Sequence, residues 1–426
     1  MMGIAMFAAA AAFCAQVPMA ETPGFLMPCH DPAIAAIVTR AWEQADKADA
    51  QIPLNDDAKP GDPTYISPQR EKDLENDVKE GEDACKEINK ELKPTTHADL
   101  QARAERIGGL MAKLANETPT VALWGDHQFS RFNYHFMVVQ SKNPDDVNAF
   151  TLPGGFVYVY EGLIRYVQSD DELAAVLGHE ISHAKFRHFA TLSREANKFN
   201  MVTLPLVIIS LLANAEQGAN VFLSQQLMTQ AVGSGWSVDA EKAADYGSFQ
   251  LLIKSPYNPT GLLTFMERLG HMEHSGPQFD WGIFTSHPPS KERAVLIASY
   301  MKKAGIPIRR SLVSTSCRVS VVPADGGKVA LKFDDKTIFE MAGSDALDRA
   351  DAAAEHLNAF LDTVPSLYEV QATSDGELTG NGQELFTLSP DDITACGMSK
   401  PDAIDAAVKG VRNAIYMLIF KIWDIS

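Results

Sequence analysis

A short string near the middle of the chain, H-E-I-S-H at residues 179–183, carries residue types that can bind a metal ion and activate water. In a helix of 3.6 residues per turn, His179 and His183 lie about 40° apart on one face, close enough to share one cation. Glu180 lies beside them, where a carboxylate can take a proton from a metal-bound water. The pattern predicts a zinc (Zn2+) hydrolase with two histidine ligands and Glu180 as general base.

The element that must position these residues is a helix predicted over residues 173–188. Apolar residues recur at positions 173, 176, 177 and 181, Asp170 and Asp171 place negative charge at the start, and Gly178 leaves room for close packing. His188 would lie about 140° around this helix from His183 and is expected to point elsewhere. The alternative is an ordinary amphipathic helix whose histidines are surface or core residues.

A third ligand is expected from a later helix, predicted over residues 239–252. A zinc site with two histidines commonly takes a carboxylate as its third protein ligand. Glu241 and Asp245 are four residues apart and so share a face, with Asp245 able to orient a ligating histidine. Considered without the upstream string, the pair could be a solvated helix face. A third histidine at metzincin spacing is excluded, because position 189 is Phe189.

Residues 148–160, N-A-F-T-L-P-G-G-F-V-Y-V-Y, predict an exposed edge strand just before the metal helix. Pro-Gly-Gly favours an edge strand or a turn over a central strand. An exposed edge can pair with an extended peptide whatever its sequence. We therefore expect a bound peptide to run beside residues 155–160, and an ordinary turn and strand is the alternative. The predicted substrate-binding residues are Gly154, Gly155, Phe156, Val157 and Tyr158.

His287 lies in T-S-H-P-P-S-K-E-R, a loop stiffened by two prolines. Three protein ligands leave one zinc position for water. His287 could fill that position and keep an enzyme latent, or donate a hydrogen bond to a developing oxyanion. We favour the first role, and a simply exposed loop histidine is the alternative.

Four strings together, H-E-I-S-H, E-K-A-A-D, N-A-F-T-L-P-G-G and S-H-P-P-S-K-E-R, resemble the gluzincin metalloproteases, a family that includes BepA, HtpX and the CAAX prenyl protease. The resemblance covers about residues 99–302. It implies His179, His183 and Glu241 as zinc ligands, Glu180 as general base, Asp245 as the partner of a ligand, and His287 as the regulatory histidine. Val238 is a departure, because many relatives have an arginine a few residues before the ligand glutamate. The 34-residue repeats that follow the BepA protease domain are also missing.

Composition and the first residues bear on location and partners. The net charge of −18 argues against a nucleic-acid partner. Residues 1–20 are uncharged and largely apolar, which predicts a signal peptide and a periplasmic or secreted protein, although no Lys or Arg precedes the apolar run. The longest later apolar run, 204–212, is too short to span a bilayer. We expect it to form a core helix, with peripheral contact with a membrane surface as the alternative.

Four cysteines follow that segment, and an even number fits an oxidising compartment. Three pairings into two disulfides are conceivable. We favour the local pairing of Cys29 with Cys85 and of Cys317 with Cys396. Four free thiols are the alternative.

The remaining patterns predict an α+β protein: a mostly helical zincin-type protease domain with a small edge-exposed sheet, and a smaller C-terminal α+β domain. Helices are expected at 31–47, 67–92, 98–114, 345–361 and 401–422, and strands at 118–124, 134–140, 319–322 and 328–333. The expected domains are a signal peptide (1–20), an N-terminal helical region (21–96), the protease domain (97–305) and an accessory domain (306–426) that binds a protein partner.

Together these features predict a zinc endopeptidase that hydrolyses unfolded or misassembled proteins in envelope quality control. A zinc-dependent chaperone or scaffold with latent proteolysis is the first alternative. A metalloenzyme acting on another bond is the second.

Overall fold

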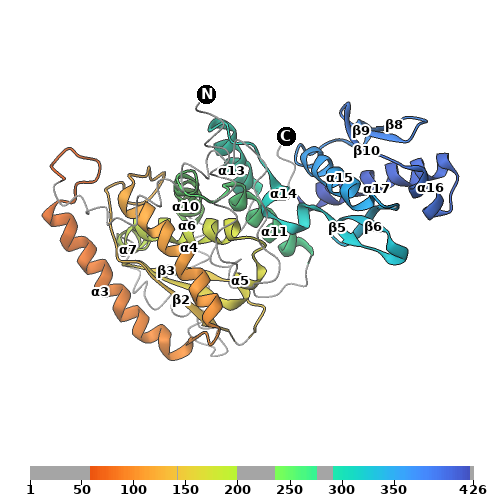
Figure 1. The fold of residues 1–426 in the computed structure, drawn as a ribbon. Helices are drawn as coiled ribbons and strands as arrows, with labels where there is room; N and C mark the ends of the chain where they lie inside the picture. Colours follow the sequence, from red (N-terminus) through yellow and green to blue (C-terminus); the bar gives the residue numbers. More distant parts are fainter. Residues whose placement is uncertain (1–57, 142, 199–235, 276–290, 423–426) are drawn as a thin grey trace, which may run out of the picture.

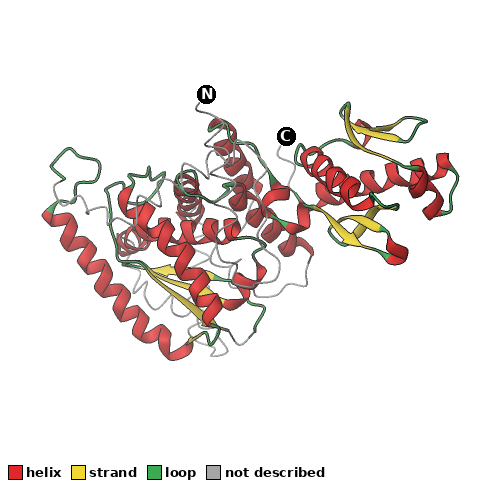
Figure 2. Cartoon of the chain, in the orientation of Figure 1, coloured by secondary structure: helices red, strands yellow, loops and turns green. Residues whose placement is uncertain are grey.

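The computed structural model describes residues 58–141, 143–198, 236–275 and 291–422, and it confirms the α+β composition (Figures 1 and 2). Helices dominate and the strands are short. The first part comprises α3 (Pro68–Glu91), β1 (Lys93–Pro94), α4 (Ala98–Glu117), β2 (His135–Gln140), β3 (Ala149–Leu152), β4 (Phe156–Tyr160), α5 (Glu161–Tyr166), α6 (Asp170–Lys185), α7 (His188–Lys198), α10 (Trp236–Leu252), α11 (Thr260–Ser275) and α13 (Lys291–Lys303). The second part comprises α14 (Arg310–Val313), β5 (Val319–Pro323), β6 (Val329–Phe333), β7 (Lys336–Met341), α15 (Ala346–Leu361), β8 (Val370–Ala372), β9 (Glu377–Gly380), β10 (Gln383–Thr387), α16 (Pro390–Cys396) and α17 (Lys400–Lys421).

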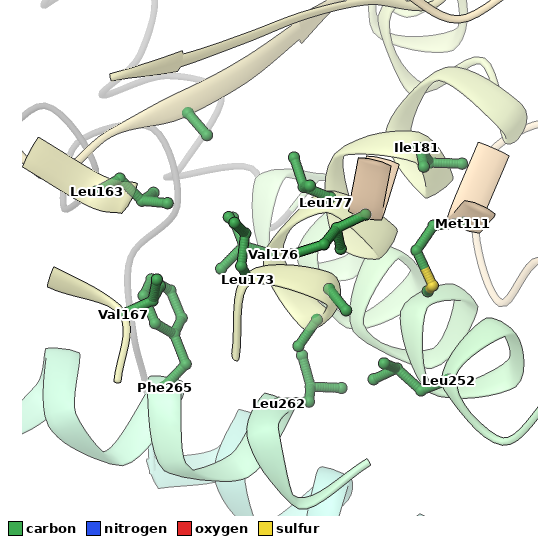
Figure 3. Close-up of a cluster of buried hydrophobic side chains, with 14 of the residues drawn as sticks. Met111, Leu163, Val167, Leu173, Val176, Leu177, Ile181, Leu252, Leu262 and Phe265 are labelled. Atoms are coloured by element: carbon green, nitrogen blue, oxygen red, sulfur yellow. The ribbon is translucent and has the colours of Figure 1, made fainter. Parts of the chain in front are cut away.

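Helix α6 is the centre of the first part, and it is buried on nearly every side. Ser169 caps its start by accepting a hydrogen bond from the Glu172 N–H, and three acidic residues in the first turn complement the helix dipole. Its apolar side chains Leu173, Val176, Leu177 and Ile181 pack among residues of α4, α5, α10 and α11 (Figure 3). A helix enclosed in this way holds its polar side chains in a defined, water-poor setting.

The four-stranded sheet has the order β1-β2-β4-β3, which corrects the expected edge strand. Strand β4 pairs in parallel with β2 and antiparallel with β3, so Val157 lies between Phe136 on one side and Thr151 on the other. The backbone of β4 is therefore already paired with β2 and β3, and the expectation that a peptide pairs beside residues 155–160 is wrong. Among the described strands, β3 has only β4 as a partner.

The long helix α3 lies against the turn between β3 and β4. A Cβ added at Gly81 of α3 would stand 2.0 Å from the Pro153 carbonyl oxygen, so only glycine permits this approach. On the turn, Gly154 has φ +80 and would place a Cβ 2.5 Å from Val78 Cα. The Pro-Gly-Gly string thus makes a tight turn against α3 instead of exposing an edge.

The second part has its own hydrophobic cluster, built from residues between Cys317 and Ile422, whereas the largest cluster of the first part ends at Met301. Strands β5-β6-β7 and β8-β9-β10 form two antiparallel sheets, and α15 and α17 pack against them. Arg310 of α14 donates two hydrogen bonds to Glu267 of α11, with both side chains 2% exposed. This buried pair joins the two parts, and the expected domain boundaries stay predictions.

The strand expected at 118–124 is wrong, because this segment is a loop. Val121 and Leu123 are exposed, and the Gln250 side chain of α10 bonds both backbone groups of Val121. The Gln250 amide thus supplies the hydrogen bonds that a neighbouring strand would otherwise give to the Val121 N–H and C=O. The strand at 134–140 and the helices at 67–92 and 98–114 are confirmed within one to three residues.

The cysteine pairing is also corrected. Cys85, Cys317 and Cys396 are free thiols. Cys317 is buried in the C-terminal cluster, and the Cys396 thiol donates instead to the Ile393 carbonyl at 3.2 Å. Cys29, the predicted signal peptide, the helix at 31–47 and the apolar run at 204–212 lie outside the described residues. Among the described helices, none has both the length and the apolar character needed to cross a membrane.

Candidate metal centre and active site

The residues predicted as metal ligands meet where α6 and α10 pack side by side. His179 Nε2 lies 3.0 Å from His183 Nε2 and 3.2 Å from Glu241 Oε2, and His183 Nε2 lies 3.3 Å from Glu241 Oε1. Zinc bonds of 2.0–2.2 Å in a tetrahedron place ligand atoms roughly 3.3 Å apart. Two imidazole nitrogens and one carboxylate, all within 4.8 Å of one another, therefore fit a divalent metal that favours nitrogen and oxygen ligands.

Close helix packing brings these residues together. Ser248 of α10 donates to the Ala175 carbonyl of α6 at 2.7 Å, and a Cβ at Gly178 would stand 2.9 Å from Ser248 Oγ. One turn further along, a Cβ at Gly247 would stand 2.7 Å from Ser182 Cβ. Small residues on both helices allow their axes to approach closely enough for Glu241 to reach the two histidines.

Asp245 supports His179 in the predicted way. Its Oδ1 lies 3.0 Å from His179 Nδ1, which leaves His179 Nε2 facing Glu241 and His183. Such a carboxylate partner fixes the tautomer and the orientation of a ligating imidazole. Burial lowers the pKa of His179, but the neighbouring carboxylates of Glu241 and Asp245 outweigh it and raise that pKa to about 10.

Arg293 of α13 completes this cluster, a role that was not predicted from the sequence. Its Nε and Nη2 donate to the two oxygens of Asp245 at 2.7 and 2.8 Å, and Nη1 lies 3.1 Å from Glu241 Oε2. Burial raises the pKa of Asp245, but the Arg293 charge and its hydrogen bonds prevail and lower it to about 2. Arg293 is the last residue of the string S-H-P-P-S-K-E-R, which is shared with the gluzincin family. Its place in that string is the sequence feature that could have identified it as a site residue.

The predicted general base, Glu180, is held by the edge strand. Thr151 Oγ1 on β3 donates to Glu180 Oε2 at 2.9 Å. Glu180 is 2% exposed, and its charge helps to raise the pKa of Arg293, which contacts Glu241, so its carboxylate lies near the ligand cluster. Nothing in the alternation of residues 148–160 distinguished Thr151 from its neighbours, because the contact depends on how β3 lies over α6.

The structure corrects the expected position of His188. Helix α6 ends at Lys185, and Arg187 has φ 49, a left-handed conformation that reverses the chain. His188 thereby returns to the site, with its Nδ1 2.9 Å from His183 Nδ1 and its Nε2 3.2 Å from the Trp124 carbonyl oxygen. The prediction that His188 points elsewhere assumed an unbroken helix. His287 lies outside the described residues.

The comparisons with known proteins agree with this geometry. The model of Peptidase family M48 matches residues 115–300. Metalloprotease YcaL of Escherichia coli (strain K12) is 30% identical over 195 residues, which are 46% of this chain and 70% of YcaL. The chain belongs to peptidase family M48. The gluzincin resemblance is thereby confirmed.

Two further relatives of this M48 chain are matched over smaller shares. Metalloprotease LoiP of Escherichia coli (strain K12) is 33% identical over 165 residues, 38% of this chain and 61% of LoiP. The Beta-barrel assembly-enhancing protease of Yersinia pestis is 32% identical over 162 residues, 37% of this chain and 31% of that protein. The chain spans less than two thirds of the length of these two relatives. Helix α3 and the C-terminal part lie outside the residues matched by the family model.

Proposed function

We propose that this M48 chain is a zinc-dependent endopeptidase whose metal ligands are His179, His183 and Glu241. The observation that carries the proposal is the cluster of three donor atoms at near-tetrahedral spacing, with Glu180 fixed beside it. The M48 relatives named metalloproteases support this chemistry. Bound zinc would act as a Lewis acid that polarises the scissile carbonyl and lowers the pKa of water.

The chain's own residues supply proton transfer and positioning. Glu180 would accept the proton of the attacking water at its carboxylate and pass it to the leaving amine. The Thr151 hydroxyl donates to Oε2 and limits rotation of this carboxylate. Asp245 and Arg293 hold His179 and Glu241 in place, so the metal ligands need little reorganisation.

The substrate strand is proposed to pair beside β3, not β4. Strand β3 lies at the end of the described sheet, and Thr151 connects it directly to Glu180. Backbone pairing along an edge grips an extended chain with little regard for its sequence. Such a site suits unfolded or misassembled proteins as substrates. A peptide-bound structure with the substrate backbone unpaired from β3 would reject this placement.

A place in envelope quality control, periplasmic or secreted, is part of the same proposal. It is supported by the apolar segment at residues 1–20 and by the relative named Beta-barrel assembly-enhancing protease. The C-terminal part, with its own hydrophobic cluster, is proposed to bind a protein partner.

The test combines metal analysis with degradation of an unfolded protein such as casein. The wild type should contain about one zinc per chain and should lose proteolysis on chelation. Glu180→Gln should keep the metal and lose about 10²- to 10⁴-fold in turnover, the usual contribution of a general base. Unchanged turnover in this variant would reject the mechanism. A chain that binds zinc and cuts no peptide would favour the chaperone alternative.

A further inference from the structure

His183 has a hydrogen-bond partner behind it that plays the part Asp245 plays for His179. A carbonyl oxygen can only accept, so the 3.2 Å contact between Trp124 O and His188 Nε2 places a proton on that nitrogen. The neutral ring then carries a bare Nδ1. This atom lies 2.9 Å from His183 Nδ1 and can accept its proton, leaving a lone pair on His183 Nε2. That nitrogen is the one facing His179 and Glu241.

The turn that returns His188 to the site is held in part from outside the residues matched by the family model. Arg187, left-handed at φ 49, donates to Asp77 of α3 at 2.5 and 2.8 Å and to Asp126 at 3.2 Å. The side chains of Arg187 and Asp77 are 8% and 7% exposed. A residue with a Cβ adopts this backbone conformation at a cost, so the ion pairs must hold it there.

A glycine loop closes the other side of the turn. Gly125 has φ +98, and a Cβ there would stand 2.6 Å from His188 Cδ2 and from the Phe186 carbonyl oxygen. The Asp126 N–H donates to that carbonyl at 2.7 Å. The His188 ring is therefore confined between this loop and His183, with little freedom to turn away.

We propose that His188 is a positioning residue for the metal ligand His183, and that helix α3 holds it in place through the Asp77–Arg187 ion pair. The inference rests on the proposed metal site. It gives α3, which precedes the matched family region, an indirect part in the metal centre, through Arg187 and His188. The relay runs from Asp77 through Arg187 and His188 to His183 Nδ1, over contacts of 2.5 to 2.9 Å at its two ends.

The test measures the affinity of the full-length chain for Co2+, by competition with a chromophoric chelator and by the visible absorption of the bound ion. His188→Leu removes the acceptor and should weaken binding about 10- to 100-fold, the usual effect of losing the partner of a metal-bound histidine. His188→Asn keeps an acceptor near the Nδ1 position and should stay within about threefold of wild type. A role in packing alone would not separate these two variants by hydrogen-bonding capacity.

Asp77→Asn tests the connection to α3. It should weaken Co2+ binding several-fold. The control is Asp83→Asn, which changes an exposed carboxylate paired with Lys86 on the same helix and should leave Co2+ affinity unchanged. If the relay is one unit, adding Asp77→Asn to His188→Leu should weaken binding no further. Should His188→Leu fail to fold, Asp77→Asn and His188→Asn carry the test.

Wild-type affinity in His188→Leu or Asp77→Asn would overturn the inference, as would effects of these two changes that multiply. An equal loss of Co2+ affinity in His188→Asn and His188→Leu would also overturn it. These results leave the proposed function intact as long as the wild type binds the metal. A wild-type chain that takes up no Co2+ or zinc would overturn the proposed function and this inference together.

Discussion

Gly247→Ala should disturb the metal centre although it touches no ligand. The new Cβ would stand 2.7 Å from both Ser182 Cβ and Phe186 Cε2, and 2.4 Å from Ser182 Oγ. Carbon atoms in contact normally lie 3.5–4.0 Å apart, so the shortfall is about 1 Å. The Ser182 hydroxyl can rotate, but its Cβ is fixed to the backbone of α6. Helix α10 must therefore move away from α6.

The expected loss of stability follows from the size of this steric overlap. Overpacking of this kind costs about 1–3 kcal/mol, and the higher helix propensity of alanine returns up to about 1 kcal/mol. A net loss of about 1–2 kcal/mol lowers the melting temperature by roughly 1–2 °C in a chain of 426 residues. A shift of about 1 Å also separates Glu241 from His179, now 3.2 Å apart, and exceeds the roughly 0.2 Å tolerance of metal–ligand distances, so metal affinity should fall.

The assay compares melting temperature and zinc affinity with those of Gly109→Ala. Gly109 lies in α4, and a Cβ there would meet nothing within 4 Å. This control should gain about 0.5–1 kcal/mol in stability and keep wild-type metal affinity. A Gly247→Ala variant that melts no lower than wild type and binds zinc equally well would refute the packing argument.

Three other predictions concern charged groups. Asp245→Ala should weaken zinc binding about 10- to 100-fold in a chelator competition, since His179 loses its partner; unchanged affinity would remove Asp245 from the support of the site. Burial raises the pKa of Asp171 to about 7. Between about pH 4 and pH 7 the folded state therefore keeps a proton that the unfolded chain releases, so wild-type stability falls as the pH rises through this range. Asp171→Asn should accordingly melt higher than wild type at pH 8 and lose this advantage toward pH 5, and a pH-independent gap would contradict the assignment. Arg310→Met should destabilise the chain by about 3–5 kcal/mol, because the buried Glu267 loses its partner. Thermal unfolding checks this, and an unchanged melting temperature would show that the pair does not stabilise the join between the two parts.

The local features of the metal centre could be predicted from the sequence alone. His179 and His183 share a face because they are four residues apart, and the same spacing brings Glu241 and Asp245 together on α10. Helix geometry is set by hydrogen bonds between near neighbours, so such relations need no knowledge of the fold. The α+β composition followed from residue periodicity for the same reason.

The structure decided everything that depends on contacts distant in sequence. Strand β4 is an inner strand because β2, some twenty residues earlier, pairs with its far side, and alternation of residues does not reveal partners. Helix α6 ends before His188 because Asp77, 110 residues before Arg187, holds Arg187 in a conformation that propensity disfavours. Arg293 reaches Asp245 across 48 residues. Spacing along the chain placed the ligands on their helices, but only tertiary packing determined which side chains hold those ligands in place.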